Sequence, residues 1–342
     1  MKVIPVEEAE GTVLCHDITE IVPGQFKGRA FKKGHVVAKA DIQKLLRLGK
    51  ESLYVWELGT GFLHENDAAT RIARAGAGFG ISLTEPVEGK ISLKAEVSGL
   101  LKINSCALEE INSIDQILFV TLHSNQIVKA GQKLASCGVV PLVIGESKIA
   151  DVEAICTSRA PIVTIKPLMS RNVGIVTTGG EVYAGRIKDQ FGPVIRRKVA
   201  DLGSRTLDQT IVPDDIKLIA NAIRDQINRG AELVIATGGM SVDPNDVTPS
   251  AIRAAGGEVL VYGAPVLPGA MFLLAKIGDV PILGVPGCVM YNKTTVLDLI
   301  LPRILAGETI TRHSIVRLGH GGLCLNCESC RFPNCSFGKG LS

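Results

Sequence analysis

Two loops in this sequence combine a threonine with a pair of glycines. They are Thr178-Gly179-Gly180 and Thr237-Gly238-Gly239, and each follows a short apolar run. Because glycine has no Cβ atom, it lets backbone N–H groups approach a phosphate closely and adopts φ values that other residues avoid. One Gly-Gly pair alone is more often a tight turn. Two such pairs, together with the nearby hydroxyls of Thr177 and Ser241, indicate a site for a phosphorylated ligand.

Carboxylates stand beside the same loops. Glu181 follows the first glycine pair, and Asp243 and Asp246 follow the second. Acidic groups next to a phosphate repel it unless a divalent cation lies between them, and Mg²⁺ is usually held by one or two carboxylates together with phosphate oxygens. The pattern therefore predicts Mg²⁺. The alternative is structural: Asp243 would start an Asp-Pro turn, and Asp246 would help to cap a helix that begins near Pro249.

Four further cysteines crowd together near the C-terminal end of the sequence. Cys324, Cys327, Cys330 and Cys335 are separated by two, two and four residues. This spacing resembles the run that holds an iron–sulfur cluster, although bacterial ferredoxins have three residues in the last gap. Zinc held by four thiolates is the other candidate. Cysteines clustered in this way favour a metal over disulfides, and the spacing leaves iron–sulfur and zinc both open.

The loops need a scaffold that brings them to one place. From Asn172 to about Gly307, short β-branched runs alternate with helical patterns, which predicts a parallel sheet covered by helices. In such a sheet the carboxyl ends of the strands meet at one edge, where ligands bind. The clearest helix spans Asp214–Asn228, with an apolar stripe of isoleucines at 216, 219, 223 and 227. The expected strands are Val173–Thr178, Leu233–Thr237, Val259–Val261 and Ile282–Val285.

Composition divides the 342 residues into several parts. We expect an N-terminal α+β segment over residues 1–60, a β-rich middle region over 61–170 whose fold the sequence does not determine, an α/β domain over 171–310, and a cysteine-rich metal-binding tail over 311–342. The fold class is thus α/β, with a mostly parallel sheet flanked by helices and a smaller mixed or β-rich N-terminal part.

Charge and hydropathy exclude several classes of protein. The net charge is only +3 and aromatic residues make up 4% of the chain, which argues against nucleic acid as a partner. No apolar run approaches the roughly 18 residues that a membrane helix needs, and the first ten residues do not fit a secretory signal. We expect a cytoplasmic protein that does not bind a membrane.

The residues described so far carry a family resemblance. The stretch from Gly174 to Leu305 resembles the molybdopterin-binding domain of the molybdenum cofactor biosynthesis proteins, and most closely the molybdopterin molybdotransferases. The resemblance implies that the α/β domain expected over 171–310 is a molybdopterin-binding domain. The matching motifs are Thr178–Val182, Gly185–Asp189, Val212–Asp215, Thr237–Val242 with Asp246, Leu267–Gly269 and Val285–Gly287.

The resemblance implies a reaction and a set of site residues. The family takes adenylylated molybdopterin and molybdate, inserts the metal into the dithiolene and releases AMP, with Mg²⁺ required. Asp246 and Glu181 correspond to acidic catalytic residues, and Asp246 would be a Mg²⁺ ligand or assist pyrophosphate cleavage. The positions implied to surround the pterin phosphate or nucleotide are Thr178, Gly179, Gly180, Thr237, Gly238, Gly239, Ser241, Asp243, Pro268, Gly269, Pro286, Gly287 and Cys288.

Two departures from the family pattern leave two functions open. Gly180 stands where molybdotransferases usually have aspartate, and Cys288 replaces an amide in the Pro286-Gly287 loop. The first function is a transferase that inserts molybdate or tungstate. The second is a non-catalytic carrier or sensor, which would use the cysteine cluster for redox response or for docking to a molybdoenzyme or another cofactor biosynthesis protein. Related enzymes form dimers, so a homodimer is one expectation for an oligomeric state that the sequence leaves open.

Overall fold

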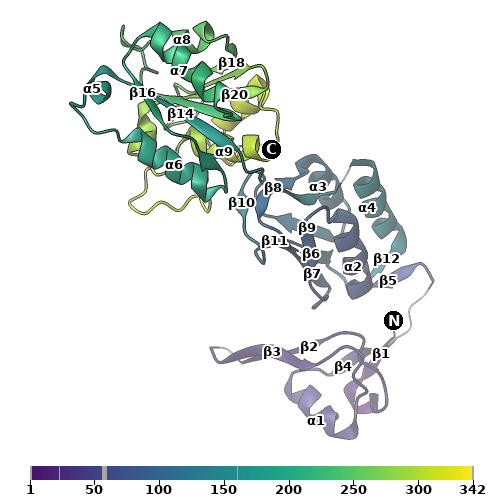
Figure 1. Cartoon of the computed structure of the whole chain (residues 1–342). Helices are drawn as coiled ribbons and strands as arrows, with labels where there is room; N and C mark the ends of the chain where they lie inside the picture. Colours follow the sequence, from purple (N-terminus) through teal and green to yellow (C-terminus); the bar gives the residue numbers. More distant parts are fainter. Residues whose placement is uncertain (1, 23, 56–59, 160, 341–342) are drawn as a thin grey trace. The chain divides into compact units, whose positions relative to one another are not determined.

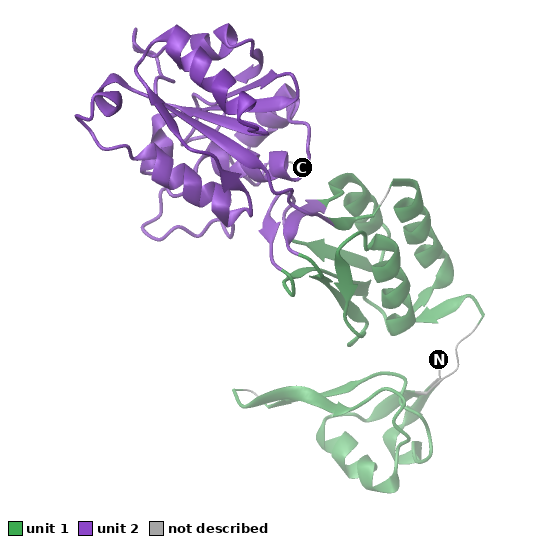
Figure 2. Cartoon of the chain, in the orientation of Figure 1, with its two compact units in different colours: residues 1–97, 103–122, 130–164 green, residues 98–102, 123–129, 165–342 purple. Residues whose placement is uncertain are grey.

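The computed structural model describes residues 2–22, 24–55, 60–159 and 161–340 (Figure 1). The chain divides into two compact units (Figure 2). Unit 1 comprises residues 1–97, 103–122 and 130–164, and unit 2 comprises residues 98–102, 123–129 and 165–342. All the loops and cysteines singled out above lie in unit 2. The boundaries expected at residues 60, 170 and 310 stay predictions.

Unit 2 is built on a seven-stranded, mostly parallel sheet. Its strands are β14 (Asn172–Thr178), β15 (Arg205–Thr206), β16 (Thr210–Val212), β17 (Leu233–Thr237), β18 (Glu258–Tyr262), β19 (Leu273–Ile277) and β20 (Val280–Val285). The order is β15-β14-β17-β20-β19-β18, and β16 also pairs with β14. The predicted α/β class is confirmed. Strand β19 was not predicted, and it runs antiparallel to both β18 and β20.

Helices cover both faces of this sheet (Figure 1). One core joins buried residues of α7 (Ile216–Asn228) and α8 (Thr248–Ala254) to β14, β17 and β20. The other joins α6 (Phe191–Asp201) and α9 (Val296–Leu305) to alternate residues of the same strands. Buried strands of this kind read as continuous apolar runs, because both faces need apolar side chains. The short helices α5 (Gly180–Tyr183) and α10 (Arg312–Val316) complete the α-helices that the structure describes in unit 2.

The predicted central helix is confirmed as α7, with one correction at its start. Asp215 is the N-cap, and its carboxylate accepts hydrogen bonds from the backbone N–H groups of Lys217 at 2.8 Å and Leu218 at 2.9 Å. Ile219 and Ile223 are fully buried, whereas Ile216 is 39% exposed. The buried part of the apolar stripe therefore begins one turn later than the sequence pattern predicted.

A small sheet precedes the main sheet in unit 2. Its order is β10-β8-β13, formed by β8 (Gly99–Ile103), β10 (Ile127–Val128) and β13 (Val163–Lys166). Lys102 on β8 and Arg303 on α9 both contact the carboxylate of Glu308, at 2.6 Å and 2.8 Å. The Glu308 side chain is only 7% exposed, whereas those of Lys102 and Arg303 are 25% and 11% exposed, so these ion pairs are partly buried.

Unit 1 combines several antiparallel sheets with helices. The largest sheet has the order β6-β7-β11-β9. Its strands are β6 (Ile81–Leu83), β7 (Lys90–Ala95), β9 (Ile117–Thr121) and β11 (Lys133–Val139), and the paired strands elsewhere are β1 (Lys2–Pro5) with β4 (Ser52–Val55), β2 (Ile18–Val22) with β3 (Phe26–Phe31), and β5 (Phe62–His64) with β12 (Val143–Gly145). The helices are α1 (Lys39–Arg47), α2 (Glu65–Gly76), α3 (Ser105–Asn112) and α4 (Glu146–Arg159). The predicted strands of the middle region are present, but α2, α3 and α4 lie among them and were not part of that prediction.

Within the part of the chain that the structure describes, every helix is too short or too polar to cross a membrane.

Candidate functional site

Three parallel strands of unit 2 end side by side. Thr177 on β14 is opposite Thr237 on β17, and Thr237 is opposite Val285 on β20. The loops that begin at Gly179, Gly238 and Pro286 therefore leave the same edge of the sheet. Short side chains at these strand ends leave the backbone of each loop close to that of its neighbour.

The two threonine-glycine-glycine loops are in direct contact. Gly238 has φ of +89°, and a Cβ atom added to it would lie 2.2 Å from the backbone oxygen of Thr178. Gly239 also has a positive φ, +55°, and a Cβ atom there would lie 3.6 Å from Oδ1 of Asp214. The same carboxylate accepts a hydrogen bond from the backbone N–H of Gly180 at 2.8 Å. Both loops thus depend on glycine, and Asp214 is held between them.

The second of these loops, together with the Pro286-Gly287 loop, borders a cavity of about 840 Å³, which we call the strand-end cleft, whereas Gly179 and Gly180 of the first loop do not line it. Ten of the residues that the sequence singled out line it: Gly238, Gly239, Ser241, Asp246, Pro268, Gly269, Pro286, Gly287 and Cys288 from the strand-end loops, and Cys324 from the cysteine cluster. Among the other lining residues are Phe191, Met271, Tyr291, Asn292 and Asn326, which the sequence did not point to. Tyr291 and Asn292 follow the Pro286-Gly287 loop by a few residues, and this proximity in the sequence is the feature from which they could have been predicted.

The remaining residues singled out from the sequence lie outside the lining of the cleft. Thr178 is buried, with its hydroxyl 3.2 Å from that of Thr248. Thr237 is also buried, and its hydroxyl has no hydrogen-bond partner among the described residues. Glu181 is exposed on the four-residue helix α5, which starts directly after Gly179. These groups support the loops or lie beside them.

The two aspartates of the second loop have different environments. The Asp243 carboxylate accepts a hydrogen bond from the backbone N–H of Asn245 at 3.1 Å, which is the turn that the structural alternative predicted. Asp246 is half-buried, and its carboxylate accepts the backbone N–H of Asp243 at 3.0 Å. Asp246 does not cap α8, because the N-cap residue is Val247 and no side chain caps that helix. Its carboxylate lines the cleft instead.

Cys288 brings a thiol to the cleft. It lies in a short 3₁₀ helix, Gly287–Met290, that begins the loop after β20. Its backbone oxygen accepts hydrogen bonds from the backbone N–H and the side-chain amide of Asn292, both at 3.0 Å. Burial raises the pKa of the Cys288 thiol, so the neutral form is favoured at neutral pH.

The cleft has few charged side chains for a site that would bind a phosphate. Its lining contains one carboxylate, that of Asp246, and no lysine or arginine among the described residues. An anionic ligand there would depend on backbone N–H groups and on a cation. Mg²⁺ requires few protein ligands when a phosphate supplies the others. The single carboxylate of Asp246 fits that kind of ion.

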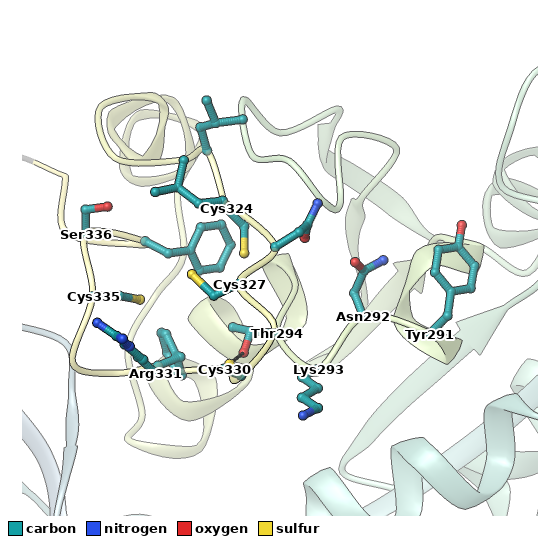
Figure 3. Close-up of a pocket in the computed structure, with 15 residues that line it drawn as sticks. Tyr291, Asn292, Lys293, Thr294, Cys324, Cys327, Cys330, Arg331, Cys335 and Ser336 are labelled. Atoms are coloured by element: carbon teal, nitrogen blue, oxygen red, sulfur yellow. Dashed lines mark hydrogen bonds between the residues drawn. The ribbon is translucent and has the colours of Figure 1, made fainter.

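The four clustered cysteines line a second, smaller cavity, which we call the cysteine cavity (Figure 3). Its volume is about 260 Å³, and the thiols of Cys324, Cys327, Cys330 and Cys335 are all free. No three histidine, cysteine, aspartate or glutamate side chains of the described residues are grouped so that they could hold a single metal ion. Hydrogen bonds from the Thr294 hydroxyl and from the backbone of Phe332 lower the pKa of the Cys330 thiol.

Unit 2 is thus an α/β domain with a glycine-lined cleft at the carboxyl ends of its parallel strands, which is where open α/β sheets bind ligands. A family model described as "Probable molybdopterin binding domain" matches residues 174–306, which confirms the resemblance seen in the sequence for this segment. Another model, described only as a domain of unknown function, matches residues 3–57.

Individual relatives share this domain and differ in name. A CinA-like protein of Thermosipho melanesiensis is 32% identical over 88 residues, which cover 26% of this chain and 22% of the relative. A molybdenum cofactor biosynthesis bifunctional protein of Synechococcus elongatus is 26% identical over 149 residues, 44% of this chain and 46% of the relative. The chain thus spans less than half the length of these curated relatives.

Among solved structures, the molybdopterin biosynthesis MoeA protein from Pyrococcus horikosii aligns with 89% of this chain and 74% of its own, at 14% identity and a TM-score of 0.34. It is the family model over residues 174–306 that marks this segment as similar to a molybdopterin-binding domain, and the relatives do not single out one activity.

Proposed function

We propose that the strand-end cleft binds molybdopterin or its adenylylated form, and that the protein inserts molybdate or tungstate into this ligand with release of AMP. The observation that supports the proposal most directly is the pair Gly238 and Gly239, which lines the cleft together with Pro286 and Gly287 from the end of the neighbouring strand. Both loops approach without side chains, which leaves room for a phosphate against the backbone.

The residues of the cleft have distinct roles in this proposal. Backbone N–H groups of the glycine loops bind the phosphate, and Phe191 and Met271 offer apolar surface to the pterin. Asp246 would hold Mg²⁺ together with phosphate oxygens, and the ion would neutralise charge on the pyrophosphate. The carboxylate of Asp246 is kept in place by the backbone N–H of Asp243 at 3.0 Å.

A non-catalytic carrier is the second candidate, and a specific observation favours it. The first loop has Gly180 where molybdotransferases usually have aspartate, and its neighbour Glu181, exposed on helix α5, is not among the residues that line the cleft. A cleft with a single acidic group would bind the finished cofactor without cleaving a pyrophosphate. Such a carrier would deliver the cofactor to a molybdoenzyme.

One assay separates the two functions. Purified protein is incubated with adenylylated molybdopterin, Mg²⁺ and molybdate, and the release of AMP is measured. We expect AMP release that falls about 10²-fold or more in Asp246→Asn. Asp279→Asn is the control, because it removes a carboxylate that is fully exposed in the β19–β20 turn.

The outcomes are distinct. Tight binding of the pterin without AMP release from the unsubstituted protein would support the carrier. No binding of molybdopterin in either form would reject both functions.

A further inference from the structure

The four cysteines of the cysteine cavity come from a stretch with little regular structure. Between residues 320 and 340 the structure describes no helix or strand. The buried anchor of the stretch is Phe337, which is 2% exposed and lies 6.2 Å from Phe332, ring centre to ring centre. A segment with so small an apolar core gains order when its cysteines share a metal group. The four thiols nevertheless lie around one cavity, and none is in a disulfide.

The cysteine run is attached at two places to loops of the strand-end cleft. The backbone N–H of Cys324 donates to the backbone oxygen of Leu267, and the N–H of Leu267 donates to Gly322, both at 2.8 Å. Leu267 directly precedes Pro268 in the cleft. At the other attachment, the Thr294 hydroxyl lies 3.3 Å from the sulfur of Cys330. Thr294 follows the loop that carries Tyr291.

The two cavities also share a wall. Tyr291, Asn292, Leu323, Cys324 and Asn326 line both of them. Cys324 therefore belongs to the cysteine run and to the rim of the strand-end cleft at once. A group bound by the four thiols would lie within one layer of side chains of a ligand in the cleft.

The arrangement of the four thiols bears on the kind of metal group that they could share. Four thiolates on one zinc ion converge on a single point, with zinc–sulfur distances near 2.3 Å. Here the four cysteines line one cavity, and among the described residues no three of them are grouped to hold one ion. A cluster, whose thiolates bind different irons, suits this arrangement better than a single ion does.

We propose that Cys324, Cys327, Cys330 and Cys335 bind an iron–sulfur cluster, and that this cluster forms part of the wall against which the ligand of the strand-end cleft binds. The second half of this proposal rests on the proposed function of the cleft, whereas the first half does not. Phe332 and Phe337 limit access of water to the cluster, and Leu323 and Asn326 separate it from the ligand.

The cluster is tested on the full chain, purified without oxygen. We expect iron and acid-labile sulfide in about equal amounts, and a broad visible absorption that bleaches with dithionite. Cys327→Ser and Cys335→Ser should lose most of the iron, whereas Cys106→Ser, which removes an exposed thiol of α3, should keep it. One zinc per chain without sulfide would overturn the assignment. The assignment would also be overturned if the unsubstituted chain took up no iron when ferrous ion and sulfide are supplied. That measurement does not depend on whether the cysteine variants fold.

The position of the cluster is tested by titrating the iron-loaded protein with molybdopterin. We expect the electron paramagnetic resonance spectrum of the reduced cluster to change and to saturate together with pterin binding. Pterin binding without any spectral change would overturn the shared wall. Absence of pterin binding would overturn the proposed function and with it the shared wall, while the iron and sulfide contents would still decide whether the cluster is present.

Discussion

Replacement of Gly238 by alanine tests whether contact between the two glycine loops shapes the cleft. An alanine Cβ would lie 2.2 Å from the backbone oxygen of Thr178 and 2.7 Å from its hydroxyl, and the φ of +89° would have to be kept. The left-handed conformation costs about 1–2 kcal/mol for an L-residue. Crowding against backbone adds about 1–3 kcal/mol.

Part of this cost is offset in the unfolded state. Alanine restricts the unfolded chain more than glycine does, which favours the folded state by about 0.4–1 kcal/mol. The net expectation for Gly238→Ala is a free energy of unfolding lower by roughly 2–4 kcal/mol. For a unit of this size, that corresponds to a fall in Tm of about 5–15 °C.

Gly287→Ala is the matched control on the opposite side of the cleft. No atom lies within 4 Å of a Cβ added to Gly287. Its stability should therefore change by no more than about 0.5 kcal/mol. The added methyl group occupies open space where the backbone borders the cleft, so we expect molybdopterin to bind about tenfold more weakly, a loss of about 1.4 kcal/mol.

Urea denaturation and calorimetric titration with molybdopterin measure the two effects separately. If Gly287→Ala unfolds as readily as Gly238→Ala, the steric argument about Thr178 is wrong. If Gly287→Ala binds molybdopterin as tightly as the unsubstituted protein, the ligand does not reach this loop.

Other predictions concern the interior. Burial alone would raise the pKa of Glu308, but hydrogen bonds from Lys102 and Arg303 outweigh it and lower the pKa. Glu308→Gln should therefore lose about 1–3 kcal/mol at pH 7, and chemical denaturation should show this difference vanishing as the pH falls through the lowered pKa. Gln226→Leu removes hydrogen bonds of 2.7 Å and 2.9 Å and should cost about 1–3 kcal/mol in urea denaturation. Burial raises the pKa of Cys137 to about 12, so mass spectrometry should find it unalkylated by iodoacetamide until the chain unfolds.

The sequence predicted the central strands well because their physical requirement is local. Leu233–Thr237 is buried at every residue, so a short apolar run is both necessary and visible in the sequence. Strand β19 was missed although Gly278-Asp279 forms a two-residue turn between it and β20, a recognisable hairpin signal. Helix α3 was missed because eight residues give too few turns for a clear helical period.

In the cleft, too, residues placed by a local sequence pattern could be predicted, and residues placed by contacts between distant segments could not. Gly238 and Gly239 could be predicted because a glycine pair after a buried strand is a local pattern. The contribution of Asp214 could not be predicted in this way, since it depends on a loop that reaches Gly180 from a different strand. Asn326 comes from the cysteine run, and no periodicity in the sequence connects that run to the strand ends.

A glycine inside the sheet also affects the cleft through a contact between segments that are distant in the sequence. Gly284 lies in the buried strand β20, where glycine ordinarily weakens a strand. A Cβ atom on Gly284 would lie 2.7 Å from Cε and 2.9 Å from Sδ of Met240. Met240 is 3% exposed and directly follows the Gly238-Gly239 pair. The missing side chain on β20 therefore makes room for the Met240 side chain, which anchors the second glycine loop. A residue inside the sheet thus helps to position Gly238 and Gly239 at the cleft.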